Sequence, residues 1–189
     1  LRWNATQSGG KNKCVNGGMD FFQRSTSNAT TGYQTADRWY QLIAGTTTVS
    51  RDTDVLSGVP VQYSLKGLTS AGTSYMQYQY SLESADVIPL RGQTVTFSWY
   101  MKKNSTWTGT FGAGNFLYSN STDARASLGT LVSTGYTNPT GVTPTTSWAR
   151  YYETITIPSD AVGFQKQFNP DVVQASGAAL WITGVQIEI

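Results

Sequence analysis

Aromatic, amide, carboxylate and guanidinium side chains gather between positions 104 and 125. Glycines interrupt this stretch and its spacing is irregular, so its rings cannot all point into one core. A pyranose ring stacks its C–H face on Trp or Tyr, while its hydroxyls bond to polar side chains. We predict sugar contact here, with loop packing as the alternative; burial of every ring within one chain would remove this argument. The candidate residues are Trp107, Asn115, Tyr118, Asn120, Asp123 and Arg125.

Two further tyrosines are candidates for ligand contact. Tyr136 lies in a loop rich in Gly, Pro and Thr, where we expect it to be exposed. Tyr75 begins an alternating segment, Ser74–Leu82, in which every second residue from Met76 onward is apolar. The opposite face carries Tyr75, Gln77, Gln79 and Ser81. It is typical of a sugar-binding sheet or of an ordinary solvated face.

The composition excludes several kinds of catalytic site. The chain has no histidine and one cysteine, so a Ser-His-Asp triad, a His-ligated metal and a thiolate cluster are all impossible. A glycosidase needs two carboxylates about 5 to 9.5 Å apart. The pairs to consider are Glu153 with Asp123 and Asp52 with Asp54, and no motif supports either. We therefore expect no enzyme and no catalytic residue, with a glycan-degrading enzyme as a less favoured alternative.

Charge and hydropathy exclude other partners. The net charge is +2, and the 13 Lys and Arg residues are scattered, which does not favour nucleic-acid binding. No apolar run approaches the roughly 20 residues that span a bilayer, so we expect no membrane insertion. The chain begins with no signal peptide and no initiator Met, so we expect it to be part of a longer polypeptide.

Alternating apolar residues predict an all-β protein without significant helix. We expect strands at residues 14–24, 36–43, 59–68, 74–82, 93–103, 126–132, 147–158, 161–169 and 178–189. In the last of these, the apolar residues change from even to odd positions at Thr183-Gly184. This change predicts a β-bulge. Residues 1–13 are polar and Gly-rich and read as an arm or linker, which leaves 14–189 as the domain. At Asp37-Arg38-Trp39 we expect a buried Trp beside a local ion pair, or else ligand contact.

Three motifs carry a family resemblance. The sequence has NGGMDFFQR at 16–24 with TADRW at 35–39, SWARYYETITIPSD at 147–160, and ALWITGVQIEI at 179–189. These motifs resemble the jelly-roll domains of phage tail-fibre and other virion proteins. Those domains are similar to galactose-binding-like carbohydrate-binding modules. The resemblance implies a two-sheet antiparallel β-sandwich of jelly-roll, galactose-binding-like type.

The resemblance also implies a function. We expect a non-catalytic module that recognises a cell-surface polysaccharide or other glycan, on the virion and outside the host cell. Its partners would include other virion protein chains, in a homotrimer. The alternative is a purely structural virion domain for subunit assembly. Related carbohydrate modules often hold a calcium ion between the first and last strands; Asp20 matches one ligand, but Thr183 and Gly184 stand where another acid is usual.

Overall fold

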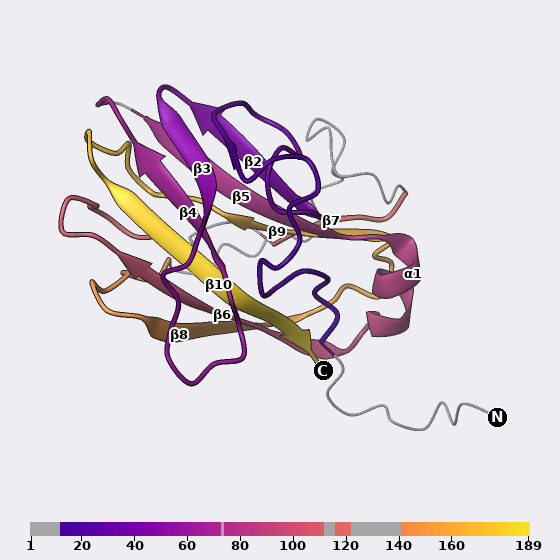
Figure 1. The fold of residues 1–189 in the computed structure, drawn as a ribbon. Coiled ribbons are helices and arrows are strands. Elements are labelled where there is room, and N and C mark those ends of the chain that lie inside the picture. Colours follow the sequence, from indigo (N-terminus) through magenta and orange to yellow (C-terminus); the bar gives the residue numbers. More distant parts are fainter. Residues whose placement is uncertain (1–11, 73, 112–115, 122–140) are drawn as a thin grey trace.

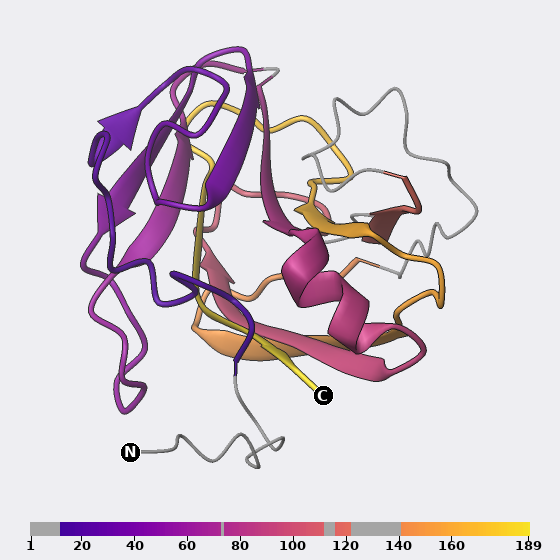
Figure 2. The same ribbon diagram turned by 90° about the vertical axis from the view of Figure 1, so that its right-hand side faces the viewer.

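The computed structural model describes residues 12–72, 74–111, 116–121 and 141–189 as two packed antiparallel β-sheets. Figure 1 shows the sandwich with both sheets, and Figure 2 shows it from the side. The prediction of an all-β, two-sheet sandwich is confirmed. Its strands are β1 (Ser27–Asn28), β2 (Trp39–Ala44), β3 (Thr47–Asp52), β4 (Ser64–Thr69), β5 (Tyr75–Leu82), β6 (Thr94–Lys103), β7 (Phe116–Ser119), β8 (Ala149–Thr156), β9 (Gly163–Phe168) and β10 (Ala179–Glu188).

The larger sheet has six strands in the order β1-β3-β4-β10-β6-β8. The C-terminal strand β10 lies at its centre, between β4 and β6. The register of β10 against β6 shifts between Thr183 and Gln186, and Gly184 has a φ of 60°. The predicted bulge is therefore confirmed, and glycine meets its need for left-handed backbone. It keeps Ile182, Val185 and Ile187 all in the core.

The smaller sheet has four strands in the order β2-β5-β9-β7. Its inner face carries the apolar set predicted for β5, from Met76 to Leu82, all of them buried. The rings of Trp39, Trp99 and Phe168 meet between the two sheets, with Trp99 contributed by β6. Burial of these large rings supplies much of the driving force that holds the sheets face to face.

Two predicted strands are wrong in part. Residues 14–24 form turns rather than a strand, and residues 59–63 form a loop before β4 begins at Ser64. The polar asparagine and glycines at 16–18 favour a turn, which the apolar residues that follow do not overcome. One helical turn, α1 (Ser84–Val87), and a 3-10 turn, η1 (Ile88–Leu90), join β5 to β6 at one end of the sandwich (Figure 1). Among the described residues, no helix has the length and apolar character to cross a membrane.

The N-terminal turn is attached to both sheets. The carbonyl of Gly17 accepts a hydrogen bond from the N–H of Val185 in β10 (2.9 Å), and Trp39 in β2 donates its indole N–H to the carbonyl of Asn16 (3.1 Å). The side-chain amide of Asn16 donates to the carbonyls of Phe21 and Asp37. Residues 12 and 13, assigned above to the arm, also hydrogen-bond to β10 at Ile187. This segment therefore fixes the chain around positions 20–38 against the sandwich.

Candidate functional site

The aromatic residues on which sugar contact was predicted lie inside the chain. Trp107 is 1% exposed and its ring meets Phe111 edge-on at 5.7 Å between centroids. Phe111 and Phe116 are equally buried, and Tyr118 is 6% exposed. The backbone of Phe111 bonds to Val142, so this segment closes over the core and turns its rings inward. The predicted ligand contact of Trp107 and Tyr118 is therefore wrong, because both rings belong to the core and neither is open to a glycan.

The other predicted contacts are scattered or lie outside the described residues. Asn120 is exposed, and its amide lies 3.5 Å from a carboxylate oxygen of Asp160. Tyr75 is half-buried on the outer face of β5. The structure does not bring Asn120 and Tyr75 into one site. Asn115, Asp123, Arg125 and Tyr136 lie outside the described residues, so their predicted role stays a prediction.

The surroundings of Asp20 do not fit a calcium ion. Calcium takes six to eight oxygen ligands, usually with several carboxylates. Among the described residues no three acidic or cysteine side chains cluster. The fully buried Thr183 donates its hydroxyl to the carbonyl of Tyr63 (2.6 Å) and lies 3.4 Å from that of Gly18. At the position where related modules carry an acidic calcium ligand, this chain therefore has a neutral hydroxyl that bonds directly to a backbone carbonyl.

Three of the four candidate catalytic acids make structural contacts, and the fourth, Asp123, lies outside the described residues. Glu153 points into the core and pairs with the fully buried Lys166 at 2.5 Å, so it does not face a substrate. Asp52 pairs with Lys66 at 3.2 Å, and Asp54 pairs with Lys102. Asp54 also accepts the indole N–H of Trp148 at 3.1 Å. These acids stabilise the sandwich.

The glutamine face of the smaller sheet is a hydrogen-bonded ladder. Gln79 of β5 and Gln165 and Gln167 of β9 are each no more than 4% exposed, so the face is neither open nor solvated. Gln167 donates its amide to Gln165 (3.0 Å), and Gln165 donates to Ser81 (3.1 Å). The Ser81 hydroxyl accepts this bond through its oxygen and can still donate its own O–H. Ser81 lies where the ladder opens into a pocket.

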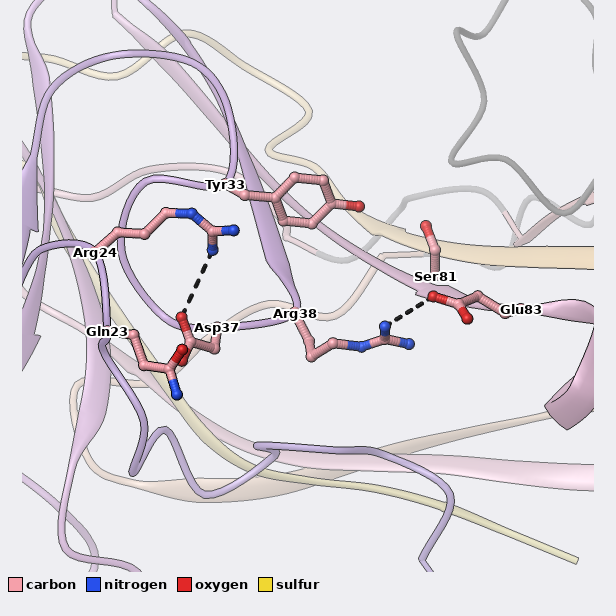
Figure 3. Close-up of a pocket in the computed structure, with 7 residues that line it drawn as sticks. All are labelled: Gln23, Arg24, Tyr33, Asp37, Arg38, Ser81 and Glu83. Carbon is pink, nitrogen blue, oxygen red and sulfur yellow. Dashed lines mark hydrogen bonds and ion pairs between the residues drawn. The ribbon is translucent and has the colours of Figure 1, made fainter.

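That pocket is the candidate site. Its volume is about 530 Å³, and Figure 3 shows its lining. Three short segments supply the side chains: the turn before β1, the loop before β2, and the end of β5 with the residue that follows it. The lining residues are Gln23, Arg24, Tyr33, Asp37, Arg38, Ser81 and Glu83.

Two ion pairs with different distances lie on opposite sides of the pocket (Figure 3). Arg38 donates to Glu83 at 2.8 Å, and this hydrogen bond raises the pKa of the guanidinium above its ordinary value. Arg24 lies 3.6 Å from Asp37, too far for a hydrogen bond, and its side chain is 59% exposed. The buried Oδ1 of Asp37 accepts no hydrogen bond from any described residue. A buried carboxylate oxygen without a donor favours a ligand that supplies one.

Tyr33 provides the aromatic surface. Its ring meets Tyr40 of β2 edge-on, with centroids 5.4 Å apart, and extends between Arg24 and Ser81 (Figure 3). Arg38 has a φ of 72°, a conformation that is strained for a residue with a side chain and is often found at functional sites. The pocket thus combines one ring, a serine donor, a buried acceptor and a balance of two positive and two negative charges.

The sequence favoured a buried Trp39 beside a local ion pair of Asp37 and Arg38, with ligand contact as the alternative. The expected local ion pair is wrong, because Asp37 pairs with Arg24 and Arg38 pairs with Glu83. No spacing in the sequence connects Arg38 with Glu83, which follows it by 45 residues. The polar face of β5 was the one signal that pointed to Ser81.

Comparisons with solved structures place the fold among carbohydrate-binding modules and near a phage tailspike domain. An enzymatically active domain of tailspike protein 4 from bacteriophage CBA120 matches with a TM-score of 0.63 and 15% identity, over 94% of this chain and 21% of that chain. A CBM22 xylan-binding domain from Paenibacillus barcinonensis matches with a TM-score of 0.52 and 14% identity, over 86% and 91%. A further β-sandwich carbohydrate-binding module structure matches with a TM-score of 0.53 and 14% identity, over 86% and 62%.

These likenesses establish the fold alone. The chain spans about a fifth of the tailspike chain that it matches. No protein-family model matches the sequence, and no curated protein matches it either. The fold is similar to that of carbohydrate-binding modules, and a fold does not by itself determine function.

Proposed function

We propose that this chain is a non-catalytic glycan-recognition module that binds a cell-surface glycan in the pocket lined by Tyr33, Asp37 and Ser81. The observation that carries the proposal is the carboxylate of Asp37, which lines the pocket. Its buried Oδ1 lies 3.6 Å from Arg24 and accepts no hydrogen bond from any described residue. The carbohydrate-binding-module fold adds support.

The binding mode follows from the chemistry of the lining. A sugar hydroxyl would donate to Asp37 Oδ1, which has no hydrogen-bond donor among the described residues. Ser81 would donate its O–H to a neighbouring sugar oxygen, since its own oxygen accepts from Gln165. The exposed guanidinium of Arg24 would donate to a second hydroxyl, while Tyr33 would cover an apolar C–H face of the ring.

The module would belong to a phage tail fibre or other virion appendage. The fold likeness to the tailspike domain supports this assignment, as do the motifs at the two ends of the chain. In such an appendage the chain would lie on the virion surface, outside the cell, and would contact other virion chains as a homotrimer. The pocket would then face the host.

A binding role fits the pocket better than hydrolysis. Its two carboxylates, Asp37 and Glu83, are each paired with an arginine, and a glycosidase acid must instead hold a proton near the scissile oxygen. We therefore propose no catalytic residue and no cofactor.

A glycan array tests the proposal. The native protein should bind a defined set of glycans, and Asp37→Asn and Tyr33→Ala should each weaken that binding by about tenfold or more, which corresponds to about 1.4 kcal/mol. Tyr152→Ala, which truncates a ring 69% exposed on the larger sheet, is the matched control and should bind normally. Unchanged binding by both pocket variants would refute the site, and the absence of any bound glycan would refute the function.

A further inference from the structure

A second groove lies away from the pocket at Tyr33, on the outer face of the six-stranded sheet. Its volume is about 380 Å³. The loop that joins β3 to β4 stands off this face, as Figures 1 and 2 agree. One wall of the groove is the Val59–Val61 part of that loop, and the floor is formed by Tyr100 and the bulge of β10. Asp20 and Asn12 of the N-terminal segment complete the lining.

The absence of a side chain at Gly184 lets the ring of Tyr100 lie close to the bulge. A β-carbon added at Gly184 would be 2.9 Å from Cδ2 of Tyr100 and 3.9 Å from Cγ1 of Val61. Tyr100, Val61 and the bulge therefore converge at Gly184, which has no side chain. Tyr100 is half-buried, so part of its ring remains accessible from the groove.

Three polar side chains in this groove are available to a ligand. The carboxylate of Asp20, the side-chain amide of Gln186 and the hydroxyl of Tyr100 make no side-chain hydrogen bond to another described residue. By contrast Asn12 is fully engaged: its oxygen accepts from Cys14 and Ile187, and its amide donates to Val185. Asn12 thus shapes the groove, while Asp20 and Gln186 remain available to a ligand.

We propose that this groove is a second, independent sugar-binding site that takes a neutral pyranose. The flat ring of Tyr100 and the apolar residues Val59, Pro60 and Val61 form two sides of a slot for the C–H faces of a sugar. Asp20 accepts from a hydroxyl, and Gln186 both donates and accepts. The lining has one carboxylate and no lysine or arginine, so its charge excludes an acidic sugar. A single ring favours a sugar over an organic cation, which is usually held by a cage of several rings.

The test is an NMR titration of the isotopically labelled full chain with methyl glycosides of glucose, galactose, mannose and xylose, and with choline. At least one sugar should shift the amide signals of Gly184 and Gln186 at millimolar concentration. Tyr100→Leu keeps apolar bulk without the flat ring and should weaken that binding by about tenfold. Asp20→Asn, at an exposed position, should weaken it while leaving the fold intact.

The signals of Ser81 and Glu83 separate this proposal from the proposed function. They report the pocket at Tyr33 and should respond equally in native protein and Tyr100→Leu. Absence of any sugar-induced shift at Gly184 and Gln186 overturns the second site whatever happens at Ser81. So do shifts that persist unchanged in both variants, or shifts produced by choline and by none of the sugars.

Discussion

At the scale of single residues, the proposed site depends on side chains held in unusual ways. Asp37 keeps a buried oxygen without a donor, and Arg38 holds a left-handed backbone conformation beside it. Both features cost free energy, of the order of 1–3 kcal/mol each. They persist because Asn16 clamps the carbonyl of Asp37 and Glu83 holds the guanidinium of Arg38.

Replacing Arg38 separates its role in the site from its role in the fold. Arg38→Gly relieves the strain of φ 72° but gives the unfolded chain more freedom, and the lost ion pair with the exposed Glu83 contributes about 1 kcal/mol or less. We expect the free energy of unfolding to change by less than about 1 kcal/mol, while glycan affinity falls. Urea unfolding and glycan titration of the same variant check both expectations. A loss of stability without a loss of affinity would make Arg38 a structural residue only.

At the scale of elements, the alternation of apolar and polar residues predicted those features of the strands that depend on local sequence. The inner faces of β5 and β6, the bulge at Gly184 and the burial of Trp39 and Trp99 all follow from residue parity. The pocket could not be predicted in this way, since it joins side chains from three segments whose proximity only the packed sheets create. Trp107 was assigned to ligand contact because its segment has irregular spacing. Irregular spacing indicates that a segment is not a regular strand, but it does not indicate that its rings lie outside the core.

The N-terminal turn provides a matched pair of glycines. A β-carbon at Gly17 would lie 2.0 Å from the carbonyl oxygen of Val185, which is backbone and cannot move aside. At Gly18 the nearest atom, at 2.8 Å, is a carboxylate oxygen of the exposed and movable Asp20. We expect Gly17→Ala to destabilise the fold by about 3 kcal/mol and Gly18→Ala by less than about 1 kcal/mol. Equal melting temperatures for the two variants would show that the turn does not bind β10 tightly.

The buried ion pair between β8 and β9 spans the two sheets. Burial lowers the pKa of the Lys166 ammonium and raises that of the Glu153 carboxyl, while their mutual attraction opposes both shifts. The ammonium also lies 4.2 Å from the ring centroid of Phe116. Lys166→Met would leave the carboxylate buried and unpaired, at a cost of about 3–5 kcal/mol.

The double variant Lys166→Met with Glu153→Met is the control for that pair. It removes both charges and should regain most of the lost stability in urea unfolding. If the double variant were as unstable as Lys166→Met alone, the cost would lie in repacking and not in an unpaired charge.

At the scale of the whole molecule, we expect hydrogen bonds, and no cation, to hold the N-terminal segment and the loop before β4 on β10. Since Thr183 bonds to Tyr63 and lies near Gly18, added calcium should leave the melting temperature unchanged within error, and so should EDTA. Thr183→Val should lower stability by about 1–3 kcal/mol, because it leaves the carbonyl of Tyr63 without its donor. A rise in melting temperature with calcium would instead restore Asp20 as a metal ligand.

The molecule as a whole has a pocket at the edge of one sheet and a separate groove on the outer face of the other. We propose that the first, lined by Tyr33, Asp37 and Ser81, holds a glycan. The most direct measurement is a crystal structure of the complex with a glycan identified on the array. We expect a sugar hydroxyl within hydrogen-bond distance of Asp37 Oδ1 and a sugar ring against Tyr33. Density for the array-identified glycan elsewhere, with this pocket containing only water, would contradict it.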